Sequence, residues 1–202
     1  MKKLLSVILA GLSVMMLFAS CSVGKEKVIV SGNYTYVTLE DNTAKITKYS
    51  SSENYLELEI PSSIDDMTVT VIGADAFSGV QTISAVTFPE TITLIEENAF
   101  KGSSITKAYM HKCSALTEIR PYAFSECPNL VQATLSGSVE TIGERAFHYC
   151  PKLKVVNFKG DTENIDRFAF DASPNVKIYT KEDCKKVIEY AESFNIEHSI
   201  SQ

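Results

Sequence analysis

The chain has 202 residues and a formal net charge of −6, so its surface would repel a polyanion, and no nucleic-acid partner is expected. Tryptophan is absent and only three histidines occur, which leaves few residues for sites built on indole or imidazole groups. One domain can hold most of this length, since single domains typically have about 100–200 residues.

The start of the chain resembles a bacterial export signal. Two lysines follow Met1, and residues 4–18 form an apolar run that is shorter than the ~20 residues a membrane-spanning helix needs. The run ends in Leu-Phe-Ala-Ser-Cys at residues 17–21, which resembles the lipobox of bacterial lipoproteins, although Phe18 stands where that family usually has leucine. We predict a signal peptide over residues 1–20 and lipidation of Cys21. A plain cleaved signal with a chance cysteine is the alternative.

The predicted lipid also sets the expected location. More than one acyl chain is needed for stable membrane anchoring, and lipoproteins of this type carry two or three. The protein is therefore expected to be exported and anchored as a lipoprotein of the bacterial envelope, at the outer membrane or the cell surface. Residues 21–32 would be the lipidated cysteine and a tether, because residues 22–27 are mostly polar.

A β-rich segment follows the predicted tether. Residues 34–39 and 44–49 read as two strands joined by a turn at Asp41-Asn42, and residues 55–60 read as a third strand closed by Pro61. We predict an N-terminal β cap over residues 33–60. Such a cap would cover the apolar start of the repeats that follow.

An Ala-Phe step recurs five times with intervals of 23, 24, 23 and 23 residues. The steps are Ala76-Phe77, Ala99-Phe100, Ala123-Phe124, Ala146-Phe147 and Ala169-Phe170. An isoleucine lies four residues before each alanine, and in two copies a glycine, Gly73 or Gly143, follows it and suits a sharp turn. A fixed period of this length predicts a solenoid in which each coil packs on the previous one.

Each coil also contains a short strand with the pattern apolar-x-x-apolar-x-apolar. These strands are expected at residues 83–88, 105–110, 130–135 and 153–158. The alternation points every second side chain into the shared core and leaves the others on the outer face of a sheet.

The repeat resembles the BspA-like leucine-rich repeat of bacterial surface proteins. The unit Ile-Gly-x-x-Ala-Phe-x-x-Cys-Pro-x-Leu at residues 142–153 carries the resemblance, which extends over about residues 55–179. It implies an α+β, β-rich, right-handed leucine-rich-repeat solenoid of about five 23-residue coils over residues 61–179. It further implies binding to other macromolecules rather than catalysis.

One copy is longer than the others at residues 111–115. Ile119 follows the preceding strand by nine residues instead of seven, so His111 and Lys112 are candidates for a loop insertion at a binding face. A neutral surface bulge is the alternative. His111 and Cys113 are close in sequence, but nothing in the pattern supplies the orienting partner that a catalytic Cys-His pair requires.

The end of the chain is predicted to close the solenoid. Residues 176–179 read as a last strand and residues 180–194 as a helix, with Thr180 and Asp183 forming a start signal close to a capping box. Residues 180–202 would thus be a C-terminal capping helix and tail, with residues 198–202 frayed.

Few residues suggest chemistry. No nucleophile elbow, P-loop or dinucleotide fingerprint occurs, so we predict no catalytic residues, no cofactor and no metal site. Cys127 and Cys150 occupy the same repeat position as Ser103 and Ser173, which indicates a small buried side chain there. We predict free thiols and leave their oxidation open.

The outward positions of the strands are the candidate binding face. They begin with Ala85 and Thr87 and continue as Lys107, Tyr109, Gln132, Thr134, Val155 and Asn157. Tyr109 is the aromatic residue of this set. An ordinary solvated sheet face is the alternative.

These features lead to one functional hypothesis and one alternative. The protein is expected to be a non-enzymatic, lipid-anchored cell-envelope module for binding or adhesion, whose repeat sheet recognises a protein or a surface polymer. The alternative is a structural spacer or assembly component of the envelope with no small ligand.

Overall fold

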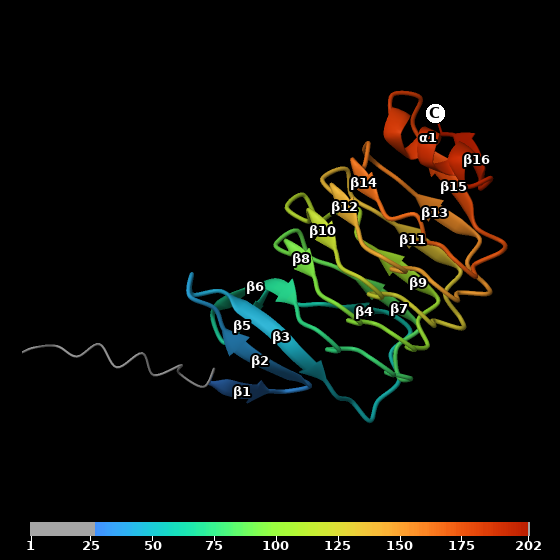
Figure 1. The fold of residues 1–202 in the computed structure, drawn as a ribbon. Helices are drawn as coiled ribbons and strands as arrows, with labels where there is room; N and C mark the ends of the chain where they lie inside the picture. The colour runs from blue at the N-terminus through green and yellow to red at the C-terminus, as the bar shows by residue number, and fades with distance from the viewer. Residues whose placement is uncertain (1–26, 202) are drawn as a thin grey trace, which may run out of the picture.

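The structure is a computed structural model that describes residues 27–201, so the predicted signal peptide and Cys21 lie outside the described residues. The described part contains 16 strands and one helix, and its coils stack along one direction (Figure 1). The elements are β1 Val28–Ser31, β2 Tyr34–Thr38, β3 Ala44–Tyr49, β4 Leu58–Glu59, β5 Ser63–Ile64, β6 Met67–Ile72, β7 Ala85–Thr87, β8 Leu94–Ile95, β9 Lys107–Tyr109, β10 Glu118–Ile119, β11 Gln132–Thr134, β12 Thr141–Ile142, β13 Val155–Asn157, β14 Asn164–Ile165, β15 Lys177–Thr180, α1 Lys185–Ser193 and β16 Glu197–Ile200.

One side of the solenoid is a seven-stranded parallel sheet, here called the repeat sheet. Its order is β4-β7-β9-β11-β13-β15-β16, so each turn of the chain adds the next strand. The second residue of each strand from β7 to β15 pairs with its counterpart in the neighbouring strand. These residues are Val86, Ala108, Ala133, Val156 and Ile178, and all are fully buried. The inward half of the predicted alternation is therefore confirmed.

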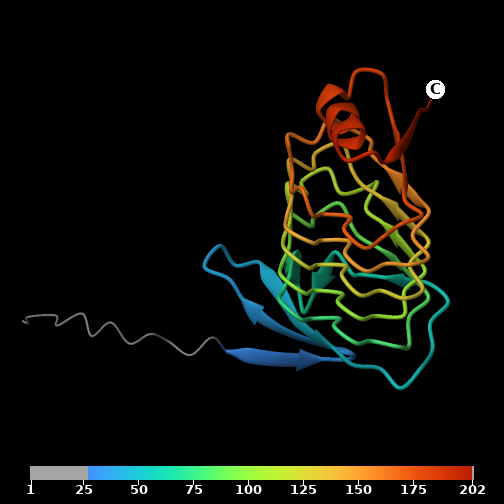
Figure 2. The same cartoon turned by 45° about the vertical axis from the view of Figure 1, so that its right-hand side comes forward.

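The opposite side is a second sheet that also carries the N-terminal cap. The short parallel strands β6, β8, β10, β12 and β14 follow one another, and β3 pairs with β6. Strands β1, β2 and β3 are antiparallel and extend this sheet beyond the first coil. Figure 2 shows this antiparallel extension projecting from the N-terminal end of the stacked coils.

The solenoid class is confirmed, but the predicted count of five coils is too low. Seven strands of the repeat sheet define about seven turns. The first turn lacks the Ala-Phe step because Tyr49 takes the place of the phenylalanine, donating its backbone N–H to Ala76 O at 2.7 Å. The last turn contains α1 instead of a further Ala-Phe step.

The five phenylalanines form one column in the core. Neighbouring ring centroids are 4.7, 5.1, 5.2 and 5.3 Å apart, and the planes differ by 5 to 11°. The first four Phe backbone N–H groups each donate to the alanine carbonyl of the next coil at 2.7–2.8 Å. The ring spacing is close to the ~4.8 Å between paired strands, so the period of the backbone places the rings in stacking contact. Tyr49 adds another ring, 5.1 Å from Phe77.

Gly73 and Gly143 begin the predicted turns, since the carbonyl of each accepts a hydrogen bond from the backbone N–H three residues later at 3.2 Å, but the turn is not what requires glycine. A Cβ atom on Gly143 would lie 2.6 Å from Pro121 N, and one on Gly73 would lie 2.6 Å from Ile46 O. Neither residue has a positive φ. Glycine is present at these two positions because the backbone of the neighbouring coil passes too close for any side chain.

The N-terminal segments differ from the expectation in two places. Residues 28–31 were expected in the tether but form β1, whose four residues pair with β2. Residues 55–60 were expected as a third cap strand, but only β4 is a strand there, and it pairs with β7. The first strand of the repeat sheet therefore lies within the segment that we assigned to the cap.

The C-terminal segments differ as well. The helix begins after Cys184, not at Thr180, which ends β15, and the predicted capping box does not form. Instead, Asp161 Oδ1 from the preceding coil accepts hydrogen bonds from the backbone N–H groups of Lys186 at 2.8 Å and Val187 at 3.1 Å. The tail does not fray over residues 197–200, which pair with β15 as β16.

The position three residues after the phenylalanine is buried in the last four copies, as predicted, whereas Val80 of the first copy is half-buried. Cys127 Sγ donates to Phe100 O at 3.1 Å, and Cys150 Sγ donates to Phe124 O at 3.2 Å. Ser173 Oγ makes the same contact with the phenylalanine of its preceding coil at 2.7 Å. Cys113, Cys127, Cys150 and Cys184 are all free thiols. The position thus selects a small donor that satisfies a carbonyl inside the core.

Candidate binding surface

The repeat sheet brings the six predicted face residues together in two rows. Lys107, Gln132 and Val155 pair across β9, β11 and β13 and form the first row. Tyr109, Thr134 and Asn157 occupy the second row at the other end of the same strands. Neighbouring members of a row are about 4.8 Å apart because they follow the spacing of paired strands.

The side chains of this face are not equally available. Lys107 is exposed, whereas Tyr109, Gln132, Val155 and Asn157 are half-buried. Thr134 is only 7% exposed, and its hydroxyl oxygen lies 3.3 Å from Gln132 Nε2 and 3.4 Å from Asn157 Nδ2. Thr134 therefore holds its two amide neighbours in place, and its own hydroxyl is largely withdrawn from a partner.

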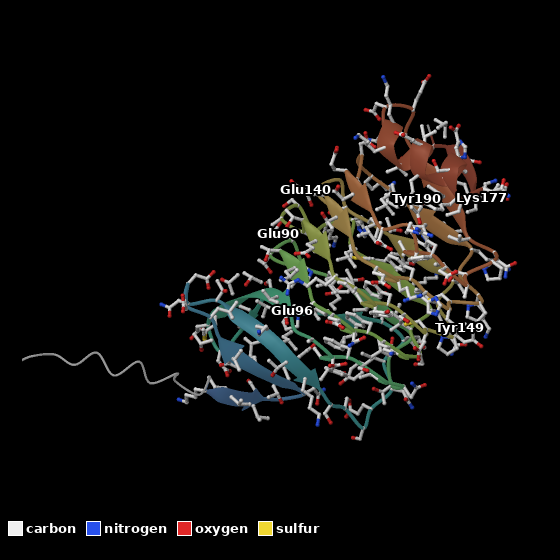
Figure 3. The ribbon with its side chains drawn as sticks, viewed as in Figure 1. Glu90, Glu96, Glu140, Tyr149, Lys177 and Tyr190 are labelled. Carbon is white, nitrogen blue, oxygen red and sulfur yellow. The ribbon has the colours of Figure 1, made fainter. Side chains whose placement is uncertain are left out.

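The rows continue beyond the six residues that the strand alternation predicts. Lys177 and Tyr179 of β15 extend the first and second rows, and Glu197 of β16 follows Lys177. Lys177 Nζ lies 2.6 Å from Glu197 Oε1 and 5.5 Å from the centroid of the Tyr179 ring. Figure 3 places Lys177 at the C-terminal end of the sheet. Tyr179 is thus a second aromatic residue of this face, which the alternation of residues 176–179 would have revealed.

The insertion at residues 111–115 lies next to this face. His111 and Lys112 are exposed, and the His111 ring lies 6.1 Å from that of Tyr109 in an edge-to-face arrangement. Cys113 anchors the insertion to the core. It is fully buried, and its thiol donates a hydrogen bond to Pro89 O at 3.3 Å. Lys112 also lines a hollow of about 340 Å³ with Glu59, Pro61 and Thr87.

The chemistry of the insertion differs from that of a nucleophilic site. Burial raises the pKa of the Cys113 thiol to about 12, whereas an activated cysteine needs a lowered pKa. Within residues 27–201, no group of three histidine, cysteine, aspartate or glutamate side chains is arranged to hold a metal ion. The described helix is also too short and too polar to cross a membrane.

Comparison with protein families identifies the repeat. The model of the BspA type leucine rich repeat region matches residues 48–177 in six copies, which is more than half of the chain. The chain belongs to this family. The BspA-type match begins within β3, in agreement with Tyr49 as the first ring of the aromatic column. A search of curated proteins by sequence found no match.

Solved structures of other bacterial proteins, several of them described as leucine-rich repeat proteins, share the fold. A Treponema pallidum leucine-rich repeat protein has 24% identity and a TM-score of 0.68, with 79% of each chain covered. The pneumococcal vaccine antigen PcpA has 20% identity and a TM-score of 0.60, over 79% of this chain and 51% of that protein. A leucine-rich repeat protein of Bacteroides capillosus has 27% identity and a TM-score of 0.52, over 67% of this chain and 100% of that one.

Family membership supports a general class of function. Proteins built from this repeat are typically protein-interaction modules, and their solenoids are generally binding scaffolds without enzymatic activity. Repeat solenoids offer an extended continuous surface, because every coil contributes equivalent positions to the same face.

Proposed function

We propose that the protein is an exported, lipid-anchored module of the bacterial cell envelope that binds a protein or a surface polymer through its repeat sheet. The observation that carries the proposal is the pair of rows on that sheet. Two lysines and two tyrosines occupy equivalent positions of these rows. They are Lys107 and Tyr109 on β9, and Lys177 and Tyr179 on β15. Strand β11, with the Thr134 hydrogen bonds, lies between β9 and β15. Tyrosine and cationic side chains on a rigid frame suit contacts with a macromolecule.

The rigidity of this face supports the proposal further. The inward residues of the same strands are fully buried, so the outward side chains project from a backbone that packing holds in place. Rigid placement lowers the entropy lost on association, which favours binding at a given contact area. Lys107 has no ion pair among the described residues, and its charge is therefore free for a partner.

Lipid anchoring can be tested at Cys21. We expect Cys21→Ser to prevent lipid attachment and to move the protein from the membrane fraction to the soluble fraction, because the serine hydroxyl does not form the thioether that carries the lipid. Metabolic labelling with a fatty acid, followed by fractionation, measures both effects. Cys127→Ser is the matched control, since serine occupies the equivalent position in two other coils, at Ser103 and Ser173. Unchanged labelling of the Cys21 variant would exclude this anchor.

Binding through the repeat sheet can be tested with Lys107→Ala/Tyr109→Ala. We expect a partner captured from the native envelope by the tagged protein to lose at least tenfold in affinity, because the variant removes a free cation and an aromatic contact. Calorimetry or surface plasmon resonance with the purified partner measures the loss. Lys101→Ala/Tyr122→Ala is the matched control, since these residues form a Lys-Tyr pair outside the repeat sheet, with 5.7 Å between Lys101 Nζ and the Tyr122 ring.

The structural alternative predicts the opposite result. A spacer that uses the solenoid only for its length would retain every envelope contact in the Lys107→Ala/Tyr109→Ala protein. Equal affinity of the double variant and the control pair would therefore reject the proposed face. Thermal unfolding of both proteins separates a lost contact from a lost fold.

A further inference from the structure

A groove of about 780 Å³ opens at the C-terminal end of the solenoid. It lies between the last Ala-Phe coil, at residues 167–176, and the segment from Tyr190 to Glu197. Helix α1 packs against β14, β15 and β16, so it covers one side of the last coil and leaves this corner open. The volume falls in the ~300–1,000 Å³ range of small-ligand sites.

Aromatic side chains form the walls of this groove. Phe168 is half-buried and lies below two guanidinium groups, with Arg167 Cζ at 4.4 Å and Arg145 Cζ at 5.3 Å from its ring centroid. Tyr190 and Phe194 have centroids 4.8 Å apart, and Phe194 is 45% exposed. Tyr190 also contacts the end of the phenylalanine column at Phe170, with 6.2 Å between centroids. These rings are therefore held by packing, and Phe194 remains accessible.

Planar polar side chains accompany the rings. They are Arg167, Asp171, Asn175, Asn195 and Glu197, and all five are exposed. Among the described residues Arg167 has no ion pair, whereas Arg145 Nη1 lies 2.7 Å from Glu144 Oε1. Asn175 Nδ2 donates to Pro151 O at 2.9 Å, which leaves its Oδ1 free to accept. The groove thus offers both donors and acceptors within reach of aromatic surface.

This combination selects among ligand classes. Glu197 is already paired with Lys177. The Asp171 carboxylate, whose Oδ2 lies 3.5 Å from His148 Nδ1, and the guanidinium of Arg167 therefore remain as opposite charges, which favours a ligand without net charge. A wholly apolar ligand would cover the Arg167 guanidinium without offering it a partner. A sugar ring satisfies both parts of the site, because its hydroxyl groups donate to carboxylates and accept from guanidinium and amide groups. Its C–H faces can pack against aromatic rings, which combine an apolar surface with polar neighbours.

We propose that this groove is a binding site for a neutral oligosaccharide. Phe194 supplies the accessible stacking surface, and Arg167 and the carboxylate of Asp171 bind hydroxyl groups. Glu197 belongs to both surfaces, because it lines the groove and continues the first row of the repeat sheet, but the residues that carry the two proposals differ. The groove therefore adds a second binding activity to the protein. The groove lies at the C-terminal end of the solenoid, whereas the repeat sheet runs along its side.

The test uses the full-length chain in detergent micelles with maltotriose, cellotriose, mannotriose and xylotriose as neutral probes and tri-galacturonate as the acidic probe. Saturation-transfer NMR and calorimetry measure binding. We expect at least one neutral trisaccharide to bind, and Phe194→Ala and Arg167→Ala each to weaken it at least threefold. Leu56→Ala and Arg120→Ala are the matched controls and should leave the affinity unchanged. Leu56 is an apolar side chain that is 88% exposed, and it precedes β4, at the opposite edge of the repeat sheet from β16 and the groove.

Several results would overturn the proposal. They are the absence of binding by all four neutral probes, a preference for tri-galacturonate, and equal losses in the groove and control variants. Loss of sugar binding in Lys107→Ala/Tyr109→Ala but not in Phe194→Ala would assign the sugar to the repeat sheet instead. That result would refute the groove and support the proposed face, so the two proposals can fail separately.

Discussion

Replacing Phe124 with alanine is expected to lower the free energy of unfolding by about 3–5 kcal/mol. Phe124 is fully buried at the centre of the column, with the rings of Phe100 and Phe147 at 5.1 and 5.2 Å. The ring of Phe88 approaches it edge-on at 6.4 Å. Removing the ring leaves a cavity that these neighbours cannot fill, because the hydrogen-bonded backbone maintains the distance between coils. Chemical denaturation measures the change.

Tyr149→Ala is the matched control for this loss. Tyr149 is an aromatic residue of the neighbouring coil, but it is 59% exposed, and we expect its replacement to change the stability by at most about 0.5 kcal/mol. Equal stabilities of the Phe124→Ala protein and this control would show that the column does not stabilise the fold.

Gly143→Ala is expected to lower the free energy of unfolding by about 2–3 kcal/mol, although it adds a single methyl group. The added Cβ would lie 2.6 Å from Pro121 N and 2.9 Å from Arg120 C. Both atoms belong to the backbone of the preceding coil, which cannot rotate away as a side chain can. The coils must therefore separate locally, which weakens the parallel pairing of β10 with β12.

Glu144→Ala tests whether the effect is specific to the close approach of the two coils. Glu144 is the next residue and is exposed, so its loss should cost at most about 0.5 kcal/mol apart from its contact with Arg145. Chemical denaturation of both variants under the same conditions gives the comparison. A Gly143→Ala protein as stable as the Glu144→Ala protein would contradict the close contact between the coils.

The repeated part of the fold was predictable because each coil contains its own complete pattern. The Ala-Phe period placed Phe77, Phe100, Phe124, Phe147 and Phe170 in one column, and the structure confirms it. Alternation within the short strands also identified the two rows that contain Lys107 and Tyr109. Both inferences depend on neighbours within one or two coils, which a periodic sequence displays directly.

The ends of the solenoid were harder to predict, because they depend on contacts with residues far away in sequence. β1 is a strand because β2 pairs with it, and β16 is a strand because β15 pairs with it, although neither segment carries a repeat. The start of α1 is held by Asp161, more than 20 residues earlier, and not by the local Thr180 signal.

In the candidate sites, too, some features follow from the sequence pattern and others depend on contacts between distant segments. The outward direction of Thr134 followed from alternation, but its two amide contacts, with Gln132 and Asn157, required the positions of two strands. The groove beside Phe194 could not be inferred from residue patterns, because it exists only where α1 leaves a corner of the last coil uncovered.

The periodic sequence was thus sufficient for the solenoid, its aromatic column and the general position of the repeat-sheet face, because identical coils repeat identical local interactions. Tertiary structure alone established the extra turns at both ends, the reason for Gly143 and the C-terminal groove. At these places the chain departs from its repeat, and the energy of each segment depends on which distant segment packs against it.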